Sequence, residues 1–93
     1  MPHLLFEIWE NPESHSFEMS LVTELGDELR KQIEPCSVLR HSFRAKSDFD
    51  AHQMNHDWHG WGEWKPEPDW AERQFTADEV AAQERYLTIR SGS

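Results

Sequence analysis

The chain has 93 residues and a net charge of −9 at neutral pH, with 18 acidic residues against nine basic ones. This length supports one domain with a modest core. The acidic excess argues against nucleic acid or an anionic membrane as a partner, because both require a basic face. No apolar run approaches the ~18 residues of a membrane span, so we expect no membrane association. A single cysteine excludes an internal disulfide and favours a cytoplasmic location.

Aromatic residues are expected to supply much of the core. The chain has only 18 Leu, Ile, Val and Phe residues, a composition close to that of disordered chains. Five tryptophans offset this shortage, because each buried ring removes a large apolar area from water. We therefore expect one folded domain over residues 1–90, followed by a flexible tail at 91–93.

Two short alternating runs open the chain. Residues 4–9 and 17–21 carry apolar side chains at every second position, which is the period of a strand with one buried face. Residues 10–14 between them contain Asn and Pro, which favour a turn. The pattern predicts a β-hairpin.

A helix is expected after the hairpin. Gly26 weakens its first turn and favours a start near Asp27, and Pro35 ends it. Its apolar residues recur at a spacing of four and form one stripe: Leu25, Leu29 and Ile33.

Alternation returns over residues 38–46 and predicts a third strand. His41 falls on its inward face, as a hydrogen-bonded core residue, and Cys36 before the strand is expected to be buried or half-buried. The outward face is basic, so we expect Arg40 and Arg44 to lie across from acidic residues of the hairpin, Glu7 and Glu18.

Two further helices are predicted from their capping residues. Ser47 caps a helix that starts at Asp48 and ends before Gly60. Thr76 and Glu79 form a capping box for a last helix over 77–87, with a hydrophobic staple between Phe75 and Val80. The expected core face of the earlier helix is formed by Ala51, Met54, Trp58 and Trp61. The fold class is therefore α+β, a three-stranded antiparallel sheet with helices packed on one face, in the order β-β-α-β-α-α.

Three histidines suggest a metal site. His52, His56 and His59 fall on one side of the predicted helix, and two imidazoles four residues apart can reach one Zn²⁺, Ni²⁺ or Cu²⁺ ion. The glutamate of the metalloprotease motif is missing between them. The alternative is an exposed histidine face that binds metal only weakly.

Tryptophans suggest a binding surface. Four of them lie within residues 58–70, and residues 48–84 carry ten acids against two bases. Tryptophan is enriched at binding hot spots, although these rings also compete for a place in the core. The expected partner-binding residues are exposed tryptophans and neighbouring acids: Trp9, Trp64, Trp70, Glu63, Glu67 and Asp69.

No catalytic motif is present in the sequence, so an enzyme is not expected. There is no nucleophile elbow, phosphate-binding loop or dinucleotide fingerprint. The leading hypothesis is a non-catalytic module without a cofactor that binds a protein partner or its own copy, including as a homodimer, through an acidic, Trp-rich surface. The alternative is a protein that binds Zn or another divalent transition metal through the three helical histidines.

Overall fold

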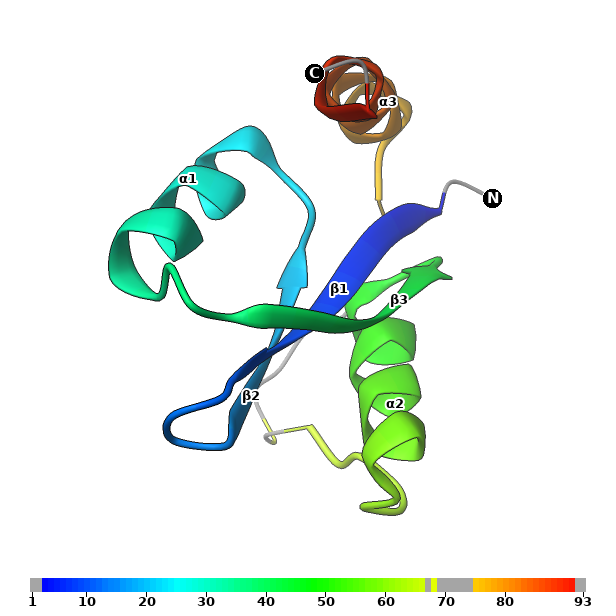
Figure 1. Ribbon diagram of the computed structural model, residues 1–93. Coiled ribbons are helices and arrows are strands. Elements are labelled where there is room, and N and C mark those ends of the chain that lie inside the picture. Colours follow the sequence, from blue (N-terminus) through cyan, green and yellow to red (C-terminus); the bar gives the residue numbers. More distant parts are fainter. Residues whose placement is uncertain (1–2, 67, 69–74, 92–93) are drawn as a thin grey trace.

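A three-stranded antiparallel sheet forms the centre of the computed structural model, which describes residues 3–66, 68 and 75–91 (Figure 1). The element order confirms the predicted α+β fold: β1 (Leu4–Asn11), β2 (Ser16–Leu21), α1 (Glu24–Ile33), β3 (Val38–Ala45), α2 (Asp48–His59) and α3 (Ala77–Ser91).

β1 is the central strand, with β2 and β3 on either side of it. Ile8 lies opposite Met19 of β2 and opposite His41 of β3. A register shift follows between Ile8 and Trp9, so that Trp9 pairs with Leu39. The predicted alternation of inward and outward side chains in β3 therefore holds from His41 to Ala45. Before His41 the register shift places Leu39 on the opposite face of the sheet from the one predicted.

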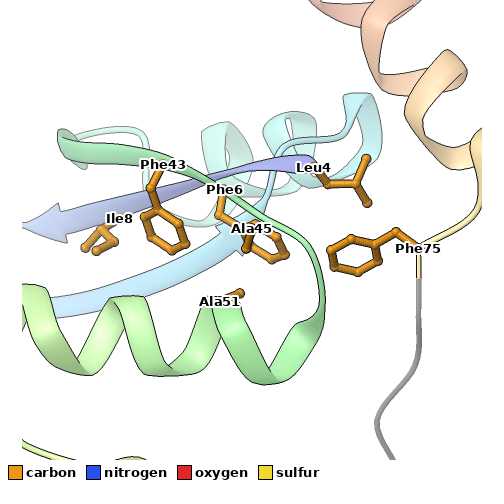
Figure 2. Packing of buried hydrophobic residues seen from close by; sticks show 7 residues of the cluster. All are labelled: Leu4, Phe6, Ile8, Phe43, Ala45, Ala51 and Phe75. Atoms are coloured by element: carbon orange, nitrogen blue, oxygen red, sulfur yellow. The ribbon is translucent and has the colours of Figure 1, made fainter. Parts of the chain in front are cut away.

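The hydrophobic core lies between one face of the sheet and α2 (Figure 2). The rings of Phe6 and Phe43 stack with centroids 5.7 Å apart, and Phe75, just before α3, approaches Phe6 at 6.0 Å. Both members of the predicted staple contribute, since Val80 packs against this cluster. The buried members of the core are Leu4, Phe6, Ile8, Phe43, Ala45, Ala51 and Phe75.

The opposite face of β1 carries Glu7 and Trp9, which contact the other two helices. Arg90 of α3 binds Glu7, and the guanidinium of Arg30 in α1 lies 3.6 Å from the centre of the Trp9 ring. Figure 1 shows α1 and α2 on opposite sides of the sheet. The expectation that helices share one face was therefore wrong, because polar and aromatic side chains on the outer face of β1 provide contacts for α1 and α3.

Capping residues set the helix starts largely as predicted. The backbone N–H of Asp50 donates to the Ser47 hydroxyl at 3.1 Å. The reciprocal hydrogen bonds between Thr76 and Glu79 confirm the capping box of α3. α1 starts at Glu24 rather than near Asp27, because the Thr23 hydroxyl accepts a hydrogen bond from the backbone N–H of Gly26.

Three further expectations are corrected. α3 continues to Ser91, past the predicted end at residue 87. Cys36 is exposed, since it lies in the turn between α1 and β3. Arg40 pairs with Glu10 at 2.7 Å instead of Glu7 or Glu18, because the register places it near the end of β1.

Within the described part of the chain, no helix combines the length and the apolar character that crossing a bilayer requires.

Candidate functional site

α2 ends in a backbone motif that turns the following loop back onto the helix. Gly60 adopts the left-handed conformation, with φ at 74°. Its N–H bonds the carbonyl of Asp57 at 3.2 Å, and the N–H of Trp61 bonds the carbonyl of His56 at 3.0 Å. These are the two hydrogen bonds of a Schellman motif, which commonly brings the residue after the glycine against the last turn. The Trp61 ring accordingly meets His56 edge-on, at a centroid distance of 5.4 Å.

Gln53 holds the next part of the loop. Its side-chain oxygen accepts from the backbone N–H of Trp64 at 3.0 Å, and its amide nitrogen donates to the carbonyl of Gly62 at 3.3 Å. Trp64 thereby lies along the side of α2, stacked on His52 at 4.4 Å and edge-on to Phe49 at 5.4 Å. The loop over residues 60–64 is thus attached to α2 by both backbone and side-chain bonds.

Five rings form a continuous surface where the end of α2 meets the sheet. Phe17 of β2 contacts Trp58 at 5.8 Å and His59 at 4.9 Å. Trp58 also stacks on His41 of β3 at 5.5 Å, and His59 stacks on Trp61 at 3.9 Å. We call these five residues the aromatic–histidine surface: Phe17, His41, Trp58, His59 and Trp61.

The three large aromatic residues of this surface remain accessible. Phe17 is 41% exposed, Trp58 is 39% exposed and Trp61 is 60% exposed. Trp61 was expected on the core face but lies outside it, because α2 ends at His59 and the Gly60 turn directs the chain away from that face. Trp58 does face the sheet, where it stacks on His41, but it is not buried in the core as expected. Ala51 is buried and Met54 packs against the core, as expected.

Of the tryptophans expected to be exposed, Trp9 and Trp64 are half-buried, and Trp70 lies outside the described residues. Trp64 is half-buried against α2, and Trp9 is half-buried beneath Arg30, with its Nε1–H donating to Glu7 at 3.2 Å. Glu63 is exposed in the loop after α2. The remaining predicted partner-binding residues lie outside the described residues: Glu67, Asp69 and Trp70.

Each predicted metal ligand contacts a tryptophan ring. His52 stacks on Trp64, whereas His56 and His59 both contact Trp61. No three His, Cys, Asp or Glu side chains among the described residues are grouped so that they could hold a metal ion. Metal binding by these histidines stays a prediction that the geometry does not favour.

Two of these histidines are held in the neutral form. Burial lowers the pKa of His52 below its ordinary value, and the nearby Asp48 carboxylate opposes part of that shift. Burial, and after it the nearby imidazole of His56, lowers the pKa of His59. Near pH 7 both rings are therefore uncharged and suited to stacking on tryptophan.

A second polar cluster, on the opposite face of the sheet, was not foreseen from the sequence. Arg90 binds both carboxylate oxygens of Glu7, at 2.8 and 3.0 Å, and its Nε reaches Asp27 at 3.2 Å. Asp27 also pairs with Arg30 at 3.0 Å and accepts a hydrogen bond from the Tyr86 hydroxyl. Both carboxylates are only 4% exposed. Since each has cationic partners, this cluster joins β1, α1 and α3 rather than offering a free acid or base.

A cavity of about 300 Å³ lies beside this cluster, between the ends of β1 and β2 and the side of α3. Two polar side chains on its wall are already engaged. Gln83 bonds the backbone of Leu5 and Val22, and the Tyr86 hydroxyl is bonded to Asp27. Polar groups that orient a ligand in a pocket must be available to it, so this cavity is a weaker candidate than the aromatic–histidine surface.

Phe17 and His41 were expected to face inward and were missed as surface residues. Both do lie on the face of the sheet that α2 covers, as their alternation predicts. The local pattern does not show that they lie beside the end of α2, because that contact joins residues far apart in the sequence.

Comparison with known proteins adds no functional information, because no family model, no curated protein and no solved structure matches this chain.

Proposed function

We propose that this protein is a non-catalytic interaction module that binds a partner protein through the aromatic–histidine surface. The observation that carries the proposal is that Phe17, Trp58 and Trp61 remain 41%, 39% and 60% exposed on one continuous surface. Large aromatic side chains gathered on a surface supply the apolar area that protein contacts bury, and tryptophan is among the residues most enriched at binding hot spots.

The surroundings of this surface favour a basic partner segment. Asp57 precedes Trp58 on α2, Glu63 follows Trp61 in the loop, and both acids are exposed. The exposed face of a tryptophan ring attracts an Arg or Lys side chain laid across it. With a net charge of −9, the chain also attracts cationic partners over a distance. The expected partner therefore contributes Arg or Lys side chains that stack on Trp58 or Trp61.

Substitution of Trp61 tests this proposal. The protein is immobilised, proteins from an extract of its native host are captured, and the affinity of a retained protein is measured by calorimetry. We expect Trp61→Ala to weaken that affinity at least tenfold, the effect of removing a hot-spot aromatic residue. Association should also slow as salt is added, because charge steers the encounter.

Ile89→Ala is the matched control, since Ile89 is 69% exposed on α3 and outside the aromatic–histidine surface. It should leave the affinity unchanged. A partner that binds Trp61→Ala as tightly as the unmodified protein would contradict the proposal. The proposal would also be contradicted if the unmodified protein retained no protein from the extract, or only proteins that Trp61→Ala retains as well.

A further inference from the structure

The basic residues of β3 are only partly neutralised inside the molecule. Residues 35–47 contain three Arg or Lys residues and no acid, although the whole chain carries a net charge of −9. Arg40 is paired with Glu10. Arg44 is exposed near the end of β3, and Lys46 is exposed just beyond it. Neither of these two side chains forms an ion pair within the described residues, so this end of the strand presents two free cations.

β3 also forms one edge of the sheet. It pairs with β1 on one side only, in the order β2-β1-β3. In the part of the chain that the structure describes, no further strand pairs with its outer side, and no turn or loop hydrogen-bonds its backbone. An edge strand presents a row of unpaired N–H and C=O groups, to which an extended segment of another protein can add.

The side chains along this edge indicate the composition of such a segment. Arg44 lies opposite Leu5 of β1, on the face of the sheet that α2 does not cover. Leu39 lies opposite Trp9 on that same face and is 43% exposed. Neighbours on one face of two paired strands interact directly, and opposite charges attract there. A complementary segment therefore carries Asp or Glu beside Arg44 and Lys46, and an apolar side chain beside Leu39.

The same cations disfavour a second copy of β3 as the occupant. Antiparallel pairing about Arg44 would place this residue opposite itself, and pairing about Ala45 would place it opposite Lys46 of the second copy. Like charges directly across two strands are destabilising, and charged side chains are a common protection of sheet edges against self-pairing. An acidic segment is instead attracted by these charges.

We propose that β3 binds an extended, acidic segment of a partner protein, which adds to the sheet as a fourth, antiparallel strand. Because the two strands run in opposite directions, the first half of the segment lies beside Arg44 and Lys46, and its second half lies beside Leu39. This contact is independent of the aromatic–histidine surface, since Arg44 and His41 lie on opposite faces of the sheet.

Peptide binding followed by two-dimensional NMR tests the proposal. The probe is a peptide as long as the eight residues of β3, with Glu at two alternate positions of its first half and Val or Thr elsewhere. The matched peptide has Lys in place of Glu. We expect the acidic peptide to bind with a dissociation constant of about 1 mM or below, to shift the amide signals of β3 and to slow their hydrogen exchange. The Lys peptide should bind β3 roughly tenfold more weakly or worse.

A charge reversal locates the contact. Arg44→Glu should weaken binding of the acidic peptide roughly tenfold or more, because attraction across the strands becomes repulsion. Arg85→Glu is the matched control, since Arg85 is exposed on α3 and its reversal changes the net charge equally. It should change the affinity by less than about twofold, because charges more than a Debye length apart are largely screened. Both side chains are exposed, so thermal unfolding should be unchanged in both variants.

N-methylation of the peptide tests whether it binds as a strand. In an antiparallel pair only every second N–H of a strand points toward its neighbour. Methylating one alternate set of peptide nitrogens should therefore abolish binding, and methylating the other set should leave it intact.

The proposal is overturned if the acidic peptide causes no shift in β3 at about 1 mM, if Arg44→Glu and Arg85→Glu weaken its binding equally, or if both methylation patterns have the same effect. Self-association of the protein that Arg44→Glu abolishes would identify a second copy as the occupant, and would overturn the proposal as well.

Discussion

Neighbouring tryptophans have different structural roles in this protein. Trp64 is packed between Phe49 and His52, whereas Trp61 is 60% exposed although it stacks on His59. Both follow α2 at a spacing of three residues, so local periodicity does not distinguish them. The difference arises because Gln53 bonds the backbone at Trp64 and holds that part of the loop against the helix.

Tyr86 reports directly on the buried ionic cluster. Burial and the hydrogen bond to the Asp27 carboxylate raise its pKa to about 12 from an ordinary value of 10. The sequence contains no other tyrosine. Tyrosinate absorbance therefore follows this single phenol without interference.

We predict that Tyr86 ionises near pH 12 in the folded protein and near pH 10 after unfolding. Because the folded pKa is the higher one, the stabilisation by this proton is complete below pH 10 and is lost as the pH rises toward 12. An ultraviolet titration of the native and the denatured protein checks the two values. Tyr86→Phe should remove the part of the alkaline decrease in unfolding free energy that comes from Tyr86. If the phenol of the folded protein instead titrated near pH 10, it would not be bound to Asp27.

The sequence predicts where the helices begin better than it predicts which of their faces is buried. The caps at Ser47 and Thr76 form as expected, since they depend on residues within one turn. The face that α1 buries does not follow from its own pattern. Asp27 is drawn inward by Arg90 and Tyr86 of α3, about sixty residues later in the chain, so the apolar stripe is left outside.

The bond between Glu7 and Arg90 should contribute strongly to the attachment of α3. Arg90→Met leaves the Glu7 carboxylate buried without its cation, so we expect a loss of about 3 kcal/mol in unfolding free energy. Chemical denaturation measures it. Arg85→Met, at an exposed position on the same helix, should change stability by less than about 0.5 kcal/mol.

The double variant Glu7→Gln with Arg90→Met shows whether this loss of stability comes from the unpaired Glu7 carboxylate or from lost packing of the Arg90 side chain. It should recover part of the loss, because the uncompensated charge is removed. Equal losses in the single and double variants would show that packing by the Arg90 side chain, and not the buried carboxylate, determines the effect.

At the scale of the whole molecule, the sequence predicted the α+β class, the element order and the antiparallel hairpin. Alternation and capping are local and strong enough for that purpose. Three features depended on long-range contacts and were missed: the division of the helices between the two faces, the ionic cluster, and the meeting of Phe17 with Trp58. The sequence predicted a Trp-rich contact surface in the second half of the chain, but none of the residues predicted for partner binding belongs to the aromatic–histidine surface.

The aromatic–histidine surface at the end of α2 is a surface and not a part of the core. Equilibrium unfolding of Trp61→Ala beside Phe43→Ala checks this distinction, since Trp61 is 60% exposed and Phe43 is 8% exposed. We predict a loss below about 1 kcal/mol for Trp61→Ala and of about 3 kcal/mol or more for Phe43→Ala. A loss for Trp61→Ala as large as that for Phe43→Ala would show that the ring belongs to the core, and would contradict the claim.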